Sequence, residues 1–145
     1  MGFNIVVGLA IPWLVGAWLY LKDRDSVLLI APFASVLAWT VNQFGFHYGF
    51  WEMSPFGSQE CSAWPFNLGL FPLSFCFTVY AARHTRYHPA LLIVASSLFL
   101  TLLEFLGVVS GHRGWNTQWT FISYLVPNLL CFAYYRLLHR QGITE

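Results

Sequence analysis

The stretch from Phe3 to Leu21 reads FNIVVGLAIPWLVGAWLYL and contains no charged residue. A helix needs about 20 mainly apolar residues to cross the hydrocarbon core of a bilayer. The charged sequence KDRD, Lys22 to Asp25, follows directly and ends the apolar stretch. A cleaved signal peptide would begin with basic residues and end in an A-x-A-like site, and this stretch has neither feature. The stretch therefore predicts a membrane-spanning helix that the chain retains.

The composition of the whole chain favours the same class of protein. Hydrophobic residues make up 57% of the 145 residues and charged residues only 9%, against about 25% charged residues in an average soluble domain. So few charges cannot cover the surface of a soluble domain of this size. The composition excludes an ordinary cytosolic enzyme, a disordered chain and a nucleic-acid-binding protein.

Four further stretches have the length and the apolarity of membrane helices. The five predicted spans are 3–21, 26–46, 66–82, 90–110 and 120–138. They leave little chain for anything else, so we expect one all-α domain, 1–145, folded as a polytopic membrane helical bundle. The third span is the shortest, and an alternative with four spans merges it with a neighbour or drops it. The connection 49–65, before this span, is the longest loop.

Lysine and arginine residues are concentrated in the loops on one side of these spans. Cytoplasmic loops of membrane proteins are rich in both residues. One side would hold six of the seven basic residues, namely Lys22, Arg24, Arg83, Arg86, Arg136 and Arg140. The other side would hold only Arg113. This asymmetry predicts an N-terminus outside the cell and a C-terminus in the cytoplasm. Asp23 and Asp25 are interpreted as part of a solvated turn.

Small and weakly polar residues recur at helical spacing in three of the spans. Helices that associate in lipid pack through such residues, so these faces are predicted to point into the bundle. The three faces consist of Gly8, Pro12 and Gly16; of Ser35, Ala38, Asn42, Gly45 and Gly49; and of Ser97, Thr101, Glu104, Val108 and Gly111.

Glu104 is the only acidic residue within a predicted span. A charged side chain at bilayer depth costs about 3 kcal/mol on insertion scales and usually lines a bundle interior or a cavity. Counted along their helices, Glu104, Asn42 and Asn128 all lie roughly 10 Å below the outer end of the bundle. Two interpretations remain open: a polar pocket that binds a ligand, and a hydrogen-bond cluster that only holds the helices together.

A polar and aromatic stretch, 111–119, lies above this layer. It supplies the candidate binding residues His112, Arg113, Trp115, Asn116 and Trp119, and His47 approaches the same surface from the second span. A guanidinium such as that of Arg113 is well shaped for a phosphate. The alternative is an interfacial turn in which the tryptophans anchor the chain at the headgroups and a polar residue caps the fifth span. Trp51 and Trp64 are interpreted as part of the same interfacial belt.

The sequence predicts no cofactor and no metal site. It contains no H-E-x-x-H and no C-x-x-C motif. A b-type haem held axially by His47 and His112 is the alternative. Cys61, Cys76 and Cys131 give no disulfide framework.

Several short motifs resemble those of a known group of proteins. They are Lys22-Asp23-Arg24, Leu70-Phe71-Pro72-Leu73-Ser74-Phe75-Cys76, Tyr87-His88-Pro89, Glu104 and the run from Trp115 to Phe121. The chain resembles a family of small, uncharacterised multi-spanning membrane proteins from spore-forming Gram-positive bacteria. The resemblance implies a bundle of about five helices in a bacterial plasma membrane. It also implies that Glu104 and the residues 115–119 belong to the family pattern, but it implies no activity.

Three functions are compatible with these residues. The first is binding a small solute, ion or proton in the pocket around Glu104, or helping it across the membrane, as an oligomer or as a subunit of a membrane complex. The second is an assembly protein without a ligand. The third is an enzyme that acts on a lipid or isoprenoid phosphate at the outer leaflet, with Glu104 or His112 as general acid or base and Arg113 holding the phosphate. Enzymatic activity is the less favoured expectation.

Overall fold

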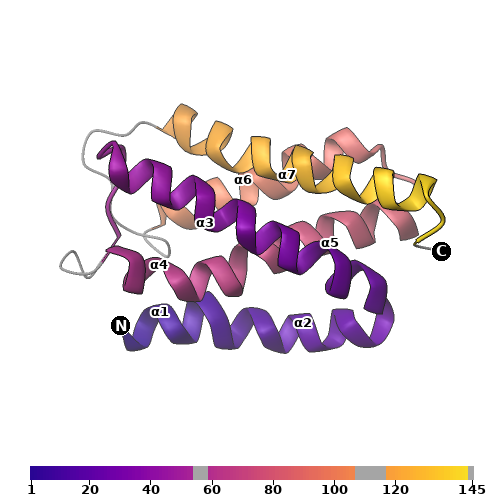
Figure 1. Cartoon of the computed structure of the whole chain (residues 1–145), viewed down its shortest axis with the longest axis horizontal. Helices are drawn as coiled ribbons and strands as arrows, with labels where there is room; N and C mark the ends of the chain where they lie inside the picture. Colours follow the sequence, from indigo (N-terminus) through magenta and orange to yellow (C-terminus); the bar gives the residue numbers. More distant parts are fainter. Residues whose placement is uncertain (54–58, 107–116, 144–145) are drawn as a thin grey trace.

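The computed structural model describes residues 1–53, 59–106 and 117–143, and every regular element in those ranges is a helix (Figure 1). This confirms the predicted all-α class. In chain order the elements are α1 (Gly2–Ile5), η1 (Val6–Ala10), α2 (Ile11–Lys22), η2 (Ser26–Ile30), α3 (Ala31–His47), α4 (Gln59–Leu68), α5 (Leu70–His84), α6 (Pro89–Phe105) and α7 (Thr117–Arg140).

Within the described ranges, four helical stretches are long and apolar enough to cross a membrane. They are Gly2–Lys22, Ser26–His47, Gln59–His84 and Gln118–Arg140. The fifth, α6, is apolar but has 17 residues, or about 25 Å at 1.5 Å per residue. The remainder of the predicted fourth span, 107–110, lies outside the described residues. The chain is therefore a bundle of four to five helices of membrane-spanning character.

The third helical stretch differs most from the predicted span in its first residue and its length. It begins at Gln59 and is continuous with α5 except for a turn at Gly69, so it has 26 residues. The prediction that 49–65 is a loop was wrong for its last seven residues. Pro65 and the polar residues before it are typical of a loop, but Ser62, Ala63 and Pro65 are buried against the neighbouring helices. The shortest predicted span is thus the longest helical stretch, because packing overrides local propensity here.

This third stretch lies in the centre of the bundle. Its second half, α5, packs against α2, α3, α6 and α7. The outer helices surround it in the order α2, η2 with α3, α7 and α6. In this order α2 contacts η2, α3 contacts α7, and α7 contacts α6. In the part of the chain that is described, α2 and α6 do not contact each other. The ring around α5 is therefore open between these two helices.

Proline residues explain irregular turns in the outer helices. A proline lacks the N–H that would bond to the carbonyl four residues earlier and crowds that carbonyl. Pro12 and Pro32 each follow a π-helical segment, a turn that widens the backbone. In α5, Pro72 cannot donate to the Leu68 carbonyl, and the Trp13 indole Nε1 donates to it instead at 2.9 Å. The first and third helical stretches are joined by this bond.

The small-residue faces point into the bundle, as predicted, over most of their length. Ser35 is half-buried, Gly49 is exposed beyond the end of α3, and Val108 and Gly111 lie outside the described residues. The members that are buried are Gly8, Pro12, Gly16, Ala38, Asn42, Gly45, Ser97 and Thr101. Close approach of the helices depends on them, since a Cβ atom at Gly8 or Gly16 would touch side chains of the central stretch.

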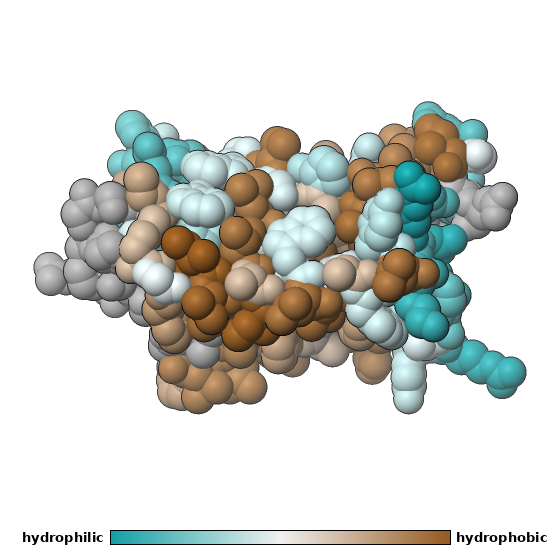
Figure 2. All heavy atoms as spheres, turned by 90° about the horizontal axis from the view of Figure 1, so that it is seen from below, coloured by the Kyte–Doolittle hydropathy of each residue, from teal (hydrophilic) through white to brown (hydrophobic). Residues whose placement is uncertain are grey.

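The end of the bundle where α2, α5 and α7 finish carries most of the charge, and hydrophilic residues gather there on the face shown in Figure 2. Asp23 and Arg83 form an ion pair of 2.7 Å at this end. The Asp23 carboxylate also accepts bonds from the Ser26 N–H at 3.1 Å and from the Ser26 hydroxyl at 2.8 Å. The Arg83 guanidinium carbon lies 5.8 Å from the centre of the Tyr135 ring. The pair thus joins the ends of three helical stretches.

The interpretation of Asp23 as part of a solvated turn was wrong. Its side chain is only 5% exposed, whereas Asp25 is half-buried. The sequence shows Asp23 between Lys22 and Arg24, which are exposed, but its partner Arg83 follows 60 residues later. The local sequence therefore predicted a solvent-exposed Asp23 side chain, and only the packing of α5 beside the turn reveals the buried ion pair.

Candidate functional site

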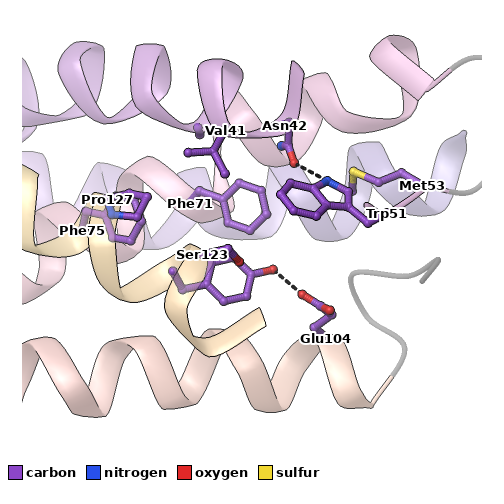
Figure 3. A pocket seen from close by; sticks show the side chains of 11 residues that line it. Val41, Asn42, Trp51, Met53, Phe71, Phe75, Glu104, Ser123 and Pro127 are labelled. Carbon is purple, nitrogen blue, oxygen red and sulfur yellow. Dashed lines mark hydrogen bonds between the residues drawn. The ribbon is translucent and has the colours of Figure 1, made fainter. Parts of the chain in front are cut away.

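A small cavity of about 40 Å³ lies between α3, α5, α6 and α7 near the end opposite the charged turn. A cavity needs about 10–15 Å³ of such space to hold one water molecule, so this one has room for a few water molecules. Polar and aromatic side chains share its wall (Figure 3). The lining residues are Ala38, Val41, Asn42, Trp51, Met53, Phe71, Phe75, Glu104, Ser123, Tyr124 and Pro127.

Glu104, near the end of α6, forms the acidic side of the cavity. Its Oε1 accepts a hydrogen bond of 3.0 Å from the Thr120 hydroxyl, and its Oε2 accepts one of 2.8 Å from the Tyr124 hydroxyl. Thr120 and Tyr124 are four residues apart, so they lie on one face of α7. Tyr124 is buried and Glu104 is half-buried. The carboxylate is thus held between α6 and α7 with one edge on the cavity (Figure 3).

An amide pair forms the opposite side. The Asn42 Nδ2 donates to the Asn67 Oδ1 at 2.6 Å, and the Trp51 indole Nε1 donates to the Asn42 Oδ1 at 3.1 Å. Asn67 is fully buried in α4, and its Nδ2 has no hydrogen-bond partner among the described residues. An unpaired buried donor costs about 1–3 kcal/mol. The cavity therefore adjoins a polar cluster with one donor that none of the described residues satisfies.

Trp51 is part of this site, and the interpretation of Trp51 as an interfacial anchor was wrong. Its side chain is 8% exposed and closes the cavity between Asn42 and Met53. Gly45 makes room for it, because a Cβ atom at that position would overlap the indole ring. Trp64, the other tryptophan assigned to the belt, is half-buried in α4.

Replacing Trp51 with phenylalanine should lower the free energy of unfolding by about 1–3 kcal/mol, because the buried Asn42 Oδ1 loses its donor. Thermal unfolding in detergent micelles would measure the loss. Trp18, which is 46% exposed on α2, gives the matched control, and W18F should change stability by less than about 0.5 kcal/mol. Equal stability of W51F and the parent protein would contradict a structural role for the indole N–H.

The structure brings together only some of the predicted site residues. Glu104 and Asn42 line the same cavity. Asn128 is buried, but its Nδ2 donates to the Ile93 carbonyl at 3.3 Å and lies 3.5 Å from the Ser97 hydroxyl, so it joins α7 to α6 away from the cavity. His47 and Trp119 are exposed and do not line it.

Four other predicted site residues cannot be placed. His112, Arg113, Trp115 and Asn116 lie outside the described residues. The haem alternative needs His112 and therefore stays a prediction, as does the expected absence of a cofactor. Within the described ranges, no group of three or more His, Cys, Asp or Glu side chains is arranged to hold a metal ion.

Sequence reasoning missed Thr120 and Tyr124, although a signal for them was present. Together with Asn128 they recur every four residues, so they form one polar stripe on α7. The amide of Asn128 is unusual within an apolar span, whereas threonine and tyrosine near a helix end are typical of interfacial residues. No local signal marks Trp51, which reaches the cavity only because the chain turns back after α3.

Comparisons with protein-family models, with curated proteins and with solved structures gave no match to the chain. The resemblance to the family from spore-forming bacteria therefore stays a prediction that rests on its short motifs alone.

Proposed function

We propose that this chain is an integral protein of a bacterial plasma membrane that binds a proton or a small cation at Glu104 and helps it cross the membrane. The observation that carries the proposal is the position of Glu104. Its carboxylate comes from an apolar helix and forms the wall of a cavity that it shares with the Asn42 amide. Acidic residues within membrane helices usually mark ion or proton pathways.

The size of the cavity narrows the class of ligand. About 40 Å³ accommodates a water molecule or an ion of similar size and excludes metabolites, which need pockets of roughly 300 Å³ or more. The polar residues at the cavity include four that carry side-chain oxygens, namely Glu104, Asn42, Ser123 and Tyr124. Oxygen atoms around one carboxylate suit a proton, a hydrated proton or a hard monovalent cation.

Protonation of Glu104 would also act on the helix packing. The ionised carboxylate accepts bonds from both hydroxyls on α7. A protonated carboxyl carries one O–H donor and keeps part of its acceptor capacity, so protonation would weaken or reverse one of these two bonds. Occupancy of the site would thus alter a hydrogen-bonded contact between α6 and α7. The four to five helices in the described ranges do not supply the paired inverted repeats of many transporter folds, so we propose that the chain acts as an oligomer or as a subunit of a membrane complex.

The proposed topology has five spans, with the N-terminus outside and the C-terminus in the cytoplasm. Its support is the end of the bundle at which Asp23 contacts Arg83. Lys22, Arg24 and Arg86 flank this pair in the chain, and α7 brings its last basic residues to the same end. Under the positive-inside rule this end faces the cytoplasm, and the Glu104 cavity then lies in the outer half.

The test is proton flux into liposomes that contain the purified protein and a trapped pH-sensitive dye. A potassium diffusion potential drives the flux. The variant E104Q keeps the shape of the side chain but takes up no proton, and protein-dependent flux should fall roughly 100-fold, in the range seen for loss of a proton-transferring group. The matched control is E60Q, which removes an exposed carboxylate on α4 and should keep the parental flux.

Infrared difference spectroscopy tests binding without transport. A step in pH should produce a carboxylic C=O band in the parent protein and in E60Q that is missing in E104Q. Unchanged flux and an unchanged band in a folded E104Q would exclude Glu104 from the function. A band without any flux would reduce the proposal to proton binding. Flux that requires sodium and is insensitive to pH would assign the site to a cation.

The two alternative functions differ in what they require. An assembly protein without a ligand requires Glu104 to be bonded and remote from any cavity. The hydroxyl bonds meet the first condition, but the carboxylate lines the cavity, which favours ligand binding. An enzyme for lipid phosphates requires His112 and Arg113 beside Glu104. Both residues lie outside the described ranges, so this alternative stays a prediction.

A further inference from the structure

A second and larger hollow lies where the ring of helices is open. It is a groove of about 620 Å³ between η1 and α2 on one side and α6 on the other, and α5 forms its floor. Apolar side chains dominate the face of the molecule on which α2 lies (Figure 2). The Glu104 cavity shares no lining residue with the groove, so the two are separate sites.

The groove is long, narrow and apolar. Its lining extends from Val7 to Leu19 on the first helical stretch, from Leu70 to Ala81 on α5 and from Leu92 to Leu103 on α6. Each of these ranges covers about 17 Å at 1.5 Å per residue, which exceeds the roughly 15 Å of hydrocarbon in one leaflet. The hydroxyls of Ser74 and Thr78 donate to carbonyls of their own helix, so they need no polar partner from the groove.

Basic residues lie in the chain segments next to the lining residues at one end of this groove. Leu19 and Lys22 are three residues apart on α2, and Lys22 is exposed. At the same end, the last residue of α5 and the turn that follows it carry the exposed side chains of His84, Arg86 and His88. No acidic residue lies in this turn, and Asp23 near it is already paired with Arg83. Asp25 is half-buried and offsets one of the three exposed charges of Lys22, Arg24 and Arg86. An apolar groove therefore opens onto a surface with an excess of positive charge.

The geometry points to an anionic phospholipid as the occupant: one acyl chain lies along the floor of α5, and the phosphate contacts Lys22 and Arg86. Basic pockets between membrane helices on the cytoplasmic side bind anionic headgroups, and a guanidinium fits a phosphate well. The acyl chain then packs against the apolar walls of the groove, and the negatively charged phosphate lies at its basic end.

A second copy of the chain fits this groove less well. Two parallel copies that packed through the groove would bring their basic ends together, and like charges at short range repel. An anionic lipid neutralises this positive charge, whereas a second copy would add an equal positive charge beside it. The proposal therefore commits to the lipid, and a dimer is an outcome that the experiment can detect.

Native mass spectrometry of the full-length protein tests the proposal, with an equimolar mixture of palmitoyl-oleoyl phosphatidylglycerol and phosphatidylcholine as the probe. The two lipids share their acyl chains and differ in headgroup charge. The parent protein should retain the anionic lipid preferentially. The preference should fall about fivefold for each basic side chain removed and should be largely lost in K22Q/R86Q. The control R136Q/R140Q removes two exposed charges from α7 and should keep it.

A second variant tests the groove itself. Ala95 is exposed on α6 and lines the groove, so A95F fills it without disturbing the core and should reduce retention of both lipids. Leu98, which is exposed on α6 and does not line the groove, gives the control L98F, which should bind as the parent does. Equal retention of the two lipids by the parent protein would overturn the proposal, as would full retention by A95F. A dimer that A95F separates into monomers would overturn it in favour of a second copy.

Discussion

Replacement of Arg83 by methionine is expected to lower the free energy of unfolding by about 3–5 kcal/mol, the cost of leaving one partner of a buried ion pair without the other. The Asp23 side chain is 5% exposed, so water cannot replace the lost guanidinium. Ser26 still donates two bonds to the carboxylate, but both come from dipoles and neither supplies a charge. The variant also loses the contact of Arg83 with the Tyr135 ring.

Unfolding of the purified protein by sodium dodecyl sulfate in mixed micelles measures this loss. The control R86M removes an exposed arginine three residues away and should change stability by less than about 0.5 kcal/mol. The double variant D23N/R83M removes both charges while the asparagine can still accept from Ser26. It should therefore be more stable than R83M alone. If R83M and R86M unfold alike, the ion pair contributes nothing to the fold.

Replacement of Gly69 by alanine is expected to cost about 3 kcal/mol, at the upper end of the range for overpacked sites. A Cβ atom at Gly69 would overlap the Gly8 carbonyl oxygen and the Leu9 Cα. Both are backbone atoms, so no side-chain rotation can make room, and η1 must move away from the junction of α4 and α5. That movement would also strain the bond between the Trp13 indole and the Leu68 carbonyl.

Two other glycines provide the comparison. A Cβ atom at Gly2 would meet no atom within 4 Å among the described residues, so G2A should leave stability unchanged. Gly45 faces the Trp51 ring, a side chain that can swing away, so G45A should cost less than G69A while changing the tryptophan fluorescence. The same unfolding experiment ranks the three variants. A G69A protein as stable as G2A would mean that the first and third stretches do not approach each other as closely as described.

Apolar runs predicted most of the fold because the length of each run and the charged residues at its ends identify a helix without reference to the rest of the chain. The absence of charge from Phe3 to Leu21 and the charged turn after it locate the first helix within one or two residues. The beginning of the third stretch was not predictable in this way. Gln59 and Glu60 are typical of a loop, and the burial of the residues that follow them depends on η1 and α3, which are distant in sequence.

The candidate site was predictable in part, for a similar reason. Glu104 and Asn42 stand out because polar side chains within apolar helices need an explanation. Tyr124 and Trp51 are ordinary residues near helix ends, and their roles arise from the partners that the fold brings to them. The buried state of Asp23 is the clearest case, since the same KDRD sequence on an isolated hairpin would be solvated. Sequence alone identifies the polar and charged side chains that are costly to bury. The packing of the helices decides which of them find a hydrogen-bond or ion-pair partner.

The distance of 60 residues between Asp23 and Arg83 also has a consequence for biosynthesis. A ribosome adds about 5–20 residues per second, so Asp23 emerges roughly 3 to 12 s before the arginine that neutralises it. During this interval the first two helices have no buried counter-ion at their turn. The pair can form only after the third stretch has been synthesised and packs beside the turn. The order of translation therefore makes the synthesis of α5 a precondition for neutralising the buried charge at this turn.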